Sequence, residues 1–476
     1  MSVQPSRPAG RRSAPATPNG VLAIVCVAIC LANLDLFIVN VALPDMARSF
    51  GDVTLDDMSW VLNAYAIAYA ALLVFFGRFA ERHRRDLSFL WGVGLFTLAS
   101  AACGAAGNVG VLVACRVVQA AGAALMTPTS LGLLLAAFPP DRRAGAVRVW
   151  TALGGFAAAL GPLVGGLLVP FSWRWIFMVN VPIGLVAVAV GCWKLPRVPG
   201  HEASRPNGGA ALLVTLGIAA LVLAIVKVND WGWSSPALAA TVAVAACCLA
   251  LFLLHCFRSR NPFIDPALFR IARFTGATLV MAPYSVAFGA MLLSVALWAQ
   301  SAWHWSALQT GLAIMPGPLM VPITSLLAGG RLLRRFGPAF VVSAGICCFV
   351  AGLVLYAVRI GLEANGAVLV GGMVVMGIGV GLTFPTLMAV GTSALPPSSL
   401  STGSGVINMI RQAALAVGVA LFVAIVGSAQ DASDRLAAFD RGWWILAAIT
   451  ALGFVPVLLL LRHRPDVLPA AEPLPR

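Results

Sequence analysis

Three charged side chains lie inside long apolar stretches of this 476-residue sequence: Asp35, Arg116 and Arg411. Burying a charge near the centre of a lipid bilayer costs roughly 2.5–3.5 kcal/mol on insertion scales, so such residues usually face a cavity or a partner. Desolvation disfavours the charged form of a carboxyl group, so Asp35 could bind and release a proton near physiological pH. Asp35 is therefore a candidate for proton coupling or substrate contact. The alternatives are a position near the outer membrane surface or a permanent pair with an arginine.

The two arginines allow several roles. Arg116, in the segment CRVVQAAGAA, could neutralise a neighbouring acid or organise water in a cavity. It could also bond backbone carbonyls between helices, and in either case we expect Arg116→Ala to impair the protein. Arg411, which precedes Gln412, stands about one turn from the end of its apolar stretch, so it could instead extend to the membrane surface.

The apolar stretch at 147–169 is rich in glycine. At about 100° per residue, Gly154, Gly161 and Gly165 share one helix face, which allows close helix packing. Pro162 removes a backbone hydrogen bond and permits a bend. The segment could act as a pivot, or it could show only the small-residue packing that is common in membrane helices.

The sequence contains no arrangement typical of an enzyme. It has no P-loop, HExxH or GxSxG motif, and its five histidines are scattered at loops or at the ends of apolar stretches. The ten cysteines form no CxxC pair, and we interpret them as small core residues. We expect no catalytic residue, no metal and no cofactor. The energy for transport would have to come from an ion gradient.

The composition indicates the class of protein that must position these residues. Apolar residues make up 60% of the chain and charged residues 10%, against roughly 45–50% and about 25% in soluble proteins. The net charge of +14 comes from small groups of Lys and Arg without interleaved aromatics, so we expect no nucleic-acid binding. The sequence predicts an all-α polytopic membrane protein.

Fourteen apolar stretches are long enough to cross a bilayer, which takes about 20 residues each. They are 21–43, 60–79, 87–106, 109–138, 147–169, 176–195, 209–228, 236–257, 275–299, 308–328, 339–356, 367–390, 406–426 and 443–461. Of the Lys and Arg residues other than Arg116 and Arg411, 23 fall at or beyond the ends of these stretches on one side and 6 on the other. The positive-inside rule then places both termini in the cytoplasm.

A weak internal repeat divides the chain. GRFAER at Gly77 recurs as GRLLRR at Gly330, an offset of 253, and Gly122 corresponds to Gly379 at an offset of 257. We expect two six-helix halves around a central cavity, as in many secondary transporters, with an extra helix pair between them. The predicted parts are a disordered cytoplasmic tail at 1–19, helix bundles at 20–196 and 259–462, a linker with two extra helices at 197–258, and a cytoplasmic tail at 463–476.

Several segments resemble the major facilitator superfamily and, within it, the fourteen-span drug:proton antiporter branch. They are LDLFIVNVALP at 34–44, GRFAERHRRDL at 77–87, RVVQAAGAA at 116–124, GPLVGG at 161–166, WRWIFMVNVPIG at 173–184 and GSGVINMIRQ at 403–412. The loop segment departs from the family pattern: Glu81 replaces Asp, Arg84 replaces Gly and Asp86 replaces a cation. Glu81 could still pair with Arg82 or with an arginine across the helices.

The resemblance implies the superfamily fold, alternating access and export of small molecules against proton entry, with Asp35 associated with proton and substrate coupling. Residues expected to control the conformational change are Gly77, Glu81, Arg82, Arg85, Gln119, Gly154, Gly161, Pro162, Gly165 and Gly166. Residues expected at the cavity are Asn40, Tyr65, Tyr69, Trp298, Arg411 and Gln412.

We therefore expect a monomeric exporter of lipophilic small molecules in the cytoplasmic membrane. It would export many different drugs and be driven by the proton gradient. Ionised Asp35 would favour the inward-facing state, and protonation from outside would favour release. With one acid in mid-span, we expect neutral, zwitterionic or monocationic substrates. One alternative is a dedicated exporter of an endogenous metabolite or siderophore. Another is a membrane sensor that does not transport.

Overall fold

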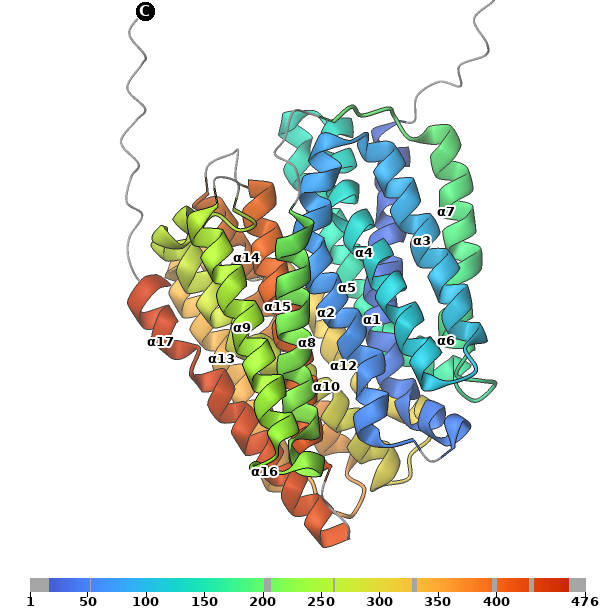
Figure 1. Ribbon diagram of the computed structural model, residues 1–476, viewed down its shortest axis with the longest axis vertical. Helices are drawn as coiled ribbons and strands as arrows, with labels where there is room; N and C mark the ends of the chain where they lie inside the picture. Colours follow the sequence, from blue (N-terminus) through green and yellow to red (C-terminus); the bar gives the residue numbers. More distant parts are fainter. Residues whose placement is uncertain are drawn as a thin grey trace, which may run out of the picture.

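The computed structural model describes residues 17–51, 53–200, 207–259, 262–327, 332–395, 400–427 and 432–461. Every regular element in these ranges is a helix, and the long helices run side by side (Figure 1). The predicted all-α class is therefore confirmed. Most of the two predicted tails lies outside the described residues, but α1 already begins at Pro18, within the range predicted for the first tail.

The first group of helices packs around α1 and α4. It comprises α1 (Pro18–Phe50), α2 (Leu55–Arg82), α3 (Arg85–Ala105), α4 (Val109–Ala137), α5 (Pro140–Leu168), α6 (Trp175–Met178) and α7 (Asn180–Lys194). Side chains fix where several of these helices begin. Thr54 accepts a hydrogen bond from the Asp57 amide (3.2 Å), and Asn108 accepts one from the Val111 amide (2.9 Å), as N-caps do.

The remaining helices form a hairpin and a second group. The hairpin is α8 (Gly208–Trp231) with α9 (Pro236–Arg258). The second group comprises η1 (Pro266–Arg270), α10 (Ala272–Ser301), α11 (Ala307–Ile314), α12 (Pro316–Leu327), α13 (Leu333–Arg359), α14 (Gly366–Ser393), α15 (Leu400–Val426), α16 (Ala432–Ala451), α17 (Phe454–Pro456) and η4 (Val457–Leu461).

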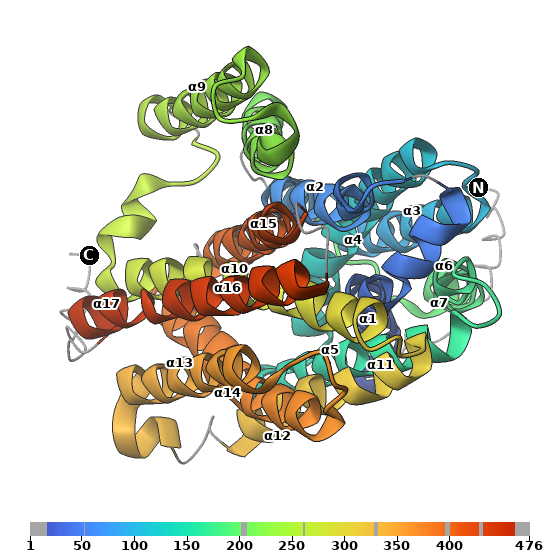
Figure 2. The same ribbon diagram turned by 90° about the horizontal axis from the view of Figure 1, so that it is seen from below.

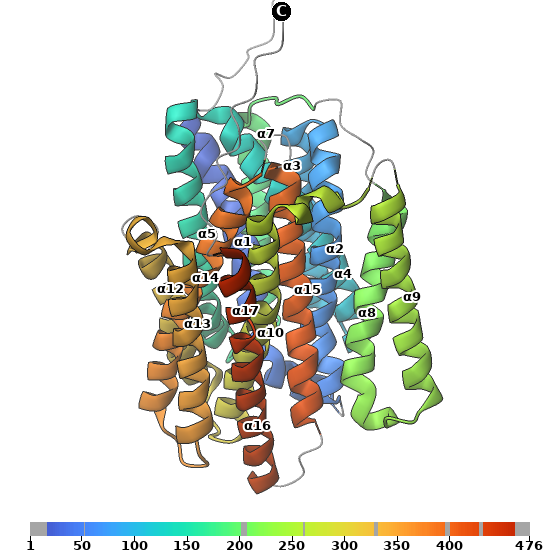
Figure 3. The same ribbon diagram turned by 90° about the vertical axis from the view of Figure 1, so that its left-hand side faces the viewer.

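The two groups meet along three contacts: α2 with α15, α5 with α11 and α12, and α1 with α10. The α8–α9 hairpin stands outside the bundle, with α8 against both α2 and α15 (Figures 2 and 3). At one end of this contact, Lys227 of α8 pairs with Asp56 of α2 (3.5 Å), and Asn229 donates a hydrogen bond to the Ala424 carbonyl of α15 (2.5 Å). The extra helices therefore bridge the two groups.

Twelve helices of the described chain are long and apolar enough to cross a membrane, so the protein is a multi-pass membrane protein. The predicted count of fourteen is not supported. The stretch 308–328 breaks at Met315 into α11 and α12, of 8 and 12 residues, because Pro316 has no amide hydrogen to continue the helix. In α5, only Leu153–Leu168 counts as an apolar helix, and it is shorter than a full span.

The sequence repeat corresponds to a repeated helix contact. A Cβ atom on Gly122 of α4 would lie 2.8 Å from the Gly92 carbonyl oxygen of α3, and one on Gly379 of α14 would lie 2.6 Å from the Gly345 carbonyl oxygen of α13. Only glycine allows backbones this close. Gly92 and Gly345 are again 253 residues apart, so both groups of helices contain the same glycine-on-glycine packing.

Candidate functional site

A buried ion pair lies at the centre of the first group. The Arg116 Nη1 atom on α4 donates a hydrogen bond to Asp35 Oδ2 on α1, and both side chains have 0% exposure. The structure thus realises one of the alternatives left open for Asp35, a pair with an arginine. It also shows that Arg116 neutralises a neighbouring acid.

Neutral side chains complete the coordination of Asp35. Asp35 Oδ1 accepts hydrogen bonds from Gln119 Nε2 (2.8 Å) and from Asn180 Nδ2 (3.2 Å). Ser100 Oγ accepts from the same two amides at 2.6 and 3.4 Å, and Gln119 Oε1 accepts from Arg116 Nη1 at 2.6 Å. Residues of α4 and α7 therefore bond the Asp35 carboxylate of α1, and Ser100 of α3 joins the network through Gln119 and Asn180. Charge-assisted hydrogen bonds of this kind offset part of the cost of burying the carboxylate.

Sequence reasoning identified three members of this network and missed two. Asp35, Arg116 and Gln119 were predicted, whereas Ser100 and Asn180 were not. Asn180 lies within WRWIFMVNVPIG, a segment that we used only as a family signature. Ser100 has no signal of its own, because a single serine in an apolar helix usually bonds its own backbone.

Arg116 also contacts α2. Its Nε donates to the Val61 carbonyl oxygen (3.1 Å), and its guanidinium carbon lies 4.1 Å from the centre of the Tyr65 ring. Its Nη2 atom is buried, and no hydrogen-bond partner is found for it among the described residues. Arg116 therefore both neutralises Asp35 and bonds a backbone carbonyl, two roles that the sequence presented as alternatives.

An aromatic contact links this pair to the second group of helices. The rings of Tyr65 and Tyr69 stack with centroids 5.9 Å apart and planes 12° apart. The Tyr69 hydroxyl shares a hydrogen bond with Thr127 Oγ1 (3.0 Å). Tyr69 lies on α2, which packs on α15 of the second group. On α15, the Arg411 guanidinium carbon is 5.9 Å from the centre of the Phe384 ring of α14, so it lies between helices.

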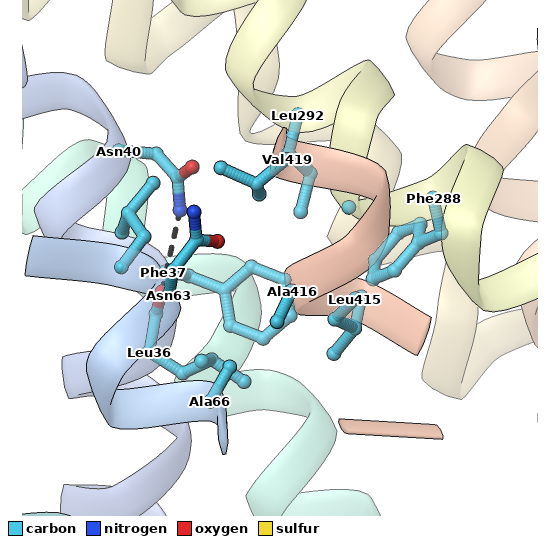
Figure 4. Close-up of a pocket in the computed structure, with 12 residues that line it drawn as sticks. Leu36, Phe37, Asn40, Asn63, Ala66, Phe288, Leu292, Leu415, Ala416 and Val419 are labelled. Atoms are coloured by element: carbon cyan, nitrogen blue, oxygen red, sulfur yellow. Dashed lines mark hydrogen bonds between the residues drawn. The ribbon is translucent and has the colours of Figure 1, made fainter. Parts of the chain in front are cut away.

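A cavity of about 40 Å³ lies between the two groups of helices (Figure 4). It is lined by Leu36, Phe37, Asn40, Leu62, Asn63, Ala66, Phe288, Gly289, Leu292, Leu415, Ala416 and Val419. Its walls are apolar except for two amides. Asn40 Nδ2 donates to the Leu36 carbonyl oxygen (3.3 Å), while both amide atoms of the buried Asn63 lack a partner within the described chain. Sequence reasoning proposed Asn40 and missed Asn63.

Five residues predicted at the cavity are not among those that line it: Tyr65, Tyr69, Trp298, Arg411 and Gln412. Tyr65 lies under Arg116, and the Tyr69 hydroxyl meets Thr127 of α4. Trp298 is fully buried against Phe439 and Trp443, with ring centroids 4.9 and 6.1 Å away. Their place along a substrate path stays a prediction. The sequence identifies an aromatic residue in an apolar helix but not the face that meets a cavity.

A second cavity, of about 810 Å³, opens at the ends of α1, α5 and α10. Its polar lining includes Asp45, Arg48, His304 and Gln309. Asp45 and Arg48 form an ion pair of 2.6 Å at its edge. The two cavities differ in character, because the first is narrow and almost entirely apolar whereas the second is wide and partly charged.

The glycine face of α5 packs on α1 next to Asp35. Cβ atoms added to Gly154, Gly161 and Gly165 would lie 3.0, 2.8 and 3.0 Å from atoms of Asn33, Phe37 and Ile38, all on α1. Their predicted common face is thus the α1 contact.

The neighbouring Gly166 faces the opposite group of helices, since its Cβ would lie 2.7 Å from the Ala307 carbonyl oxygen. Pro162 lies inside α5, with its carbonyl group against Gly311 of α11. Together these residues place α5 between α1 and α11.

The loop after α2 contains an ion pair between Arg84 and Asp86. Arg84 Nη2 and Asp86 Oδ2 are 2.5 Å apart, and this contact raises the pKa of the Arg84 guanidinium. Asp86 also accepts a hydrogen bond from the Val198 amide (3.3 Å), and the Arg85 amide donates to the Val198 carbonyl (3.0 Å). Two of the three departures from the family pattern thus pair with each other and tie this loop to the segment after α7.

Two other predicted residues lie on α2. Arg82 is its last residue, and no atom would lie within 4 Å of a Cβ on Gly77. The side chain of Glu81 lies outside the described residues. Within the described chain, no group of three or more metal-binding side chains is found.

The chain matches a family model, that of the Major Facilitator Superfamily, over residues 25–419 and again over 286–475. It is 32% identical over 426 residues to the Methylenomycin A resistance protein of Streptomyces coelicolor, which covers 89% of this chain and 88% of that protein. It is 34% identical over 397 residues to the multidrug resistance protein Stp of Mycobacterium tuberculosis, covering 83% and 72%. It is 30% identical over 446 residues to the cephamycin export protein CmcT of Amycolatopsis lactamdurans, covering 93% and 92%.

A solved structure shares the fold. A peptide transporter in complex with sulfate superposes with a TM-score of 0.68 at 13% sequence identity, covering 93% of this chain and 95% of that one. At that identity the likeness concerns the fold alone.

Proposed function

The chain belongs to the Major Facilitator Superfamily, and on that premise we propose that it is a secondary active exporter of lipophilic small molecules, a multidrug or antibiotic efflux protein driven by proton entry. The names of its relatives support the export function: one confers resistance to methylenomycin A, one is a multidrug resistance protein and one exports cephamycin. The observation that carries the proton coupling is the Asp35 carboxylate, which is buried in a membrane-spanning helix and bound by residues of two other helices, α4 and α7.

Protonation of Asp35 would change the forces in this network. The proton cancels the charge that holds Arg116, and a neutral carboxyl group offers its neighbours only ordinary hydrogen bonds, which are roughly half as strong as charge-assisted ones. Arg116 would then be free to move with α4 and with its contacts on α2. A proton that enters along the membrane potential supplies about 2.3 kcal/mol per 100 mV, which can drive such a rearrangement.

The glycine contact gives this rearrangement a route to the second group of helices. α5 packs on α1 beside Asp35 and on α11 through Gly166. A shift of α1 would therefore displace α5 and change the contact between the two groups. We propose that the groups, at 20–196 and 259–462, are the halves that move against each other in alternating access. The 40 Å³ cavity is then the closed remnant of the transport path, and the 810 Å³ cavity is its outer vestibule.

We also propose the finer topology. If α5 and the broken pair α11–α12 each cross the membrane, as their packing between the long helices suggests, the chain has fourteen spans and belongs to the drug:proton antiporter branch. The asymmetry of Lys and Arg then places both termini in the cytoplasm. The protein would work as a monomer with lipophilic substrates, protons and the bilayer as its partners.

The experiment that tests the function uses inverted membrane vesicles with a preset pH gradient. A panel of chemically unrelated lipophilic drugs is added, and collapse of the gradient is compared between the wild type and Asp35→Asn. We expect several drugs to collapse the gradient in the wild type and none to do so in the variant. If no drug does so in wild-type vesicles that contain folded protein, proton-coupled multidrug efflux is wrong.

A further inference from the structure

Arg411 is a partly buried cation that has no anionic partner among the described residues. Its Nε atom is shielded from solvent and has no hydrogen-bond partner, and no ion pair joins it to a carboxylate among the described residues. Its guanidinium carbon lies 5.9 Å from the centre of the Phe384 ring. A charge that is partly withdrawn from water is unfavourable unless an opposite charge meets it.

Asp35, the acid in mid-span, is not available to Arg411. Both carboxylate oxygens of Asp35 are bonded, one to Arg116 and the other to Gln119 and Asn180. The expectation of neutral, zwitterionic or monocationic substrates rested on Asp35 as the one acid in mid-span. Since Arg116 neutralises that acid, the uncompensated charge between the two groups of helices is positive.

Arg411 lies next to the central cavity. It shares a face of α15 with Leu415 and Val419, one and two turns away, and both of these line the cavity. On α2, Tyr69 is one turn from the cavity residue Ala66. Phe384, against which the guanidinium lies, contacts the cavity residue Phe288 with ring centroids 5.4 Å apart.

The central cavity is apolar, and the positive charge of Arg411 lies next to it. The walls are leucines, phenylalanines and small residues, with the unpartnered amide of Asn63 on one side (Figure 4). A guanidinium group binds a carboxylate through two parallel hydrogen bonds. The ligand that meets both features is an amphiphile with an apolar ring system and one carboxylate.

We propose that Arg411 is the subsite for the carboxylate of such a substrate, with the apolar cavity holding its body. This inference rests on the proposed export function and narrows its substrate class to lipophilic monoanions. Because the cavity of about 40 Å³ is smaller than a drug molecule, the substrate enters when α2 and α15 have moved apart. Arg411 then exchanges its aromatic neighbour for the carboxylate.

The test measures binding to the purified wild-type protein by fluorescence anisotropy, with 1-pyrenebutyrate and 1-pyrenebutanol as matched probes. The two share an aromatic body and differ in charge. We expect pyrenebutyrate to bind at least tenfold more tightly than pyrenebutanol. Equal binding of the two probes to the wild type overturns the proposal, and this result needs no variant.

Three variants locate the effect. Arg411→Gln should remove the preference while leaving pyrenebutanol binding within about twofold of wild type, and Arg411→Lys should keep part of the preference because it retains the charge. Arg359→Gln removes an exposed arginine at the end of α13 and should change nothing. If Arg411→Gln keeps the full preference, Arg411 is not the carboxylate subsite.

Thermal unfolding separates a binding role from a structural one. Without ligand, Arg411→Gln should unfold at the same temperature as the wild type or higher, because it removes an unpaired, partly buried charge. Pyrenebutyrate should raise the unfolding temperature of the wild type only. A large destabilisation of Arg411→Gln without ligand would indicate a structural role and contradict the proposal.

The outcomes also separate this inference from the export function. If drugs collapse the pH gradient in vesicles but no carboxylate preference is found, export stands and the anion subsite fails. If pyrenebutyrate binds through Arg411 but no compound moves protons, the subsite stands and proton-coupled export fails.

Discussion

Tyr65 and Tyr69 stack on the same face of α2 with ring centroids 5.9 Å apart, and the Arg116 guanidinium lies 4.1 Å from the centre of the Tyr65 ring. The stacked rings therefore extend from the buried ion pair along α2, the helix that packs on α15 of the other group. A change in the charge of Asp35 can reach the contact between the groups through these two side chains.

This relationship predicts the effect of Tyr65→Leu. The substitution keeps an apolar side chain but removes both the ring under Arg116 and the stacking on Tyr69, and a buried cation–π contact is worth about 2 kcal/mol. We expect drug-induced collapse of the pH gradient in inverted vesicles to slow at least fivefold. Tyr65→Phe retains the ring and should behave as the wild type. Equal rates for Tyr65→Leu and Tyr65→Phe would show that the ring does not couple the two groups.

A second prediction concerns the stability of the ion pair. Asp35→Asn and Arg116→Gln each leave one buried charge without its partner, which costs about 3–5 kcal/mol. The double variant leaves neither charge, so it should unfold at a higher temperature than either single variant. Thermal unfolding of the purified proteins measures this coupling. Additive destabilisation in the double variant would mean that the two charges do not stabilise each other.

The charged part of the site could be predicted from the sequence, because a charge inside an apolar stretch is conspicuous. Asp35 and Arg116 were found this way, and the structure places them in contact. The neutral part could not. Asn63, Ser100 and Asn180 are each fully buried, but nothing in their sequence neighbours distinguishes an amide or hydroxyl that faces a cavity from one that bonds its own helix.

The fold shows the same division. Hydropathy located the long helices, and the glycine spacing of α5 gave the face that packs on α1. Hydropathy did not detect the break between α11 and α12, because Pro316 and its neighbours remain apolar while interrupting the helix. It also could not assign Trp298 to the contact with α16, since burial against another helix and burial at a cavity require the same kind of residue.

A third prediction concerns the cytoplasmic loop. Asp86→Ala removes the partner of Arg84 and the acceptor of the Val198 amide. Because Arg84 is 42% exposed, the ion pair itself contributes little to stability, so we expect little change in the unfolding temperature. The loop should nevertheless open more often, and trypsin should cleave within residues 82–85 several-fold faster.

The side of the membrane on which trypsin acts tests the proposed orientation at the same time. Cleavage should occur in inverted vesicles, which expose the cytoplasmic face, and not in right-side-out vesicles. Asp434→Ala, at an exposed residue near the start of α16, is the matched control and should leave the cleavage rate unchanged. Faster cleavage in right-side-out vesicles would place this loop outside the cell.

The last prediction concerns the contact between α5 and α1. Gly161→Ala adds a Cβ atom 2.8 Å from Phe37 Cβ and 3.1 Å from the Ile38 amide nitrogen, so α1 must move away beside Asp35. Overpacking of this kind costs about 1–3 kcal/mol, which a folded protein can tolerate, but the displaced α1 would misplace Asp35 relative to Arg116. We expect the protein to fold and its drug-dependent proton movement to fall at least tenfold.

Gly155 provides the matched control for this contact. It lies on the same helix, but a Cβ there would have its nearest neighbour 4.0 Å away, at Pro322. Gly155→Ala should therefore retain transport within about twofold of the wild type, although both variants add the same methyl group to α5. If the two variants transport equally well, close packing of α5 on α1 is not required for coupling. If both lose transport, the cause is the helix itself and not its contact with α1.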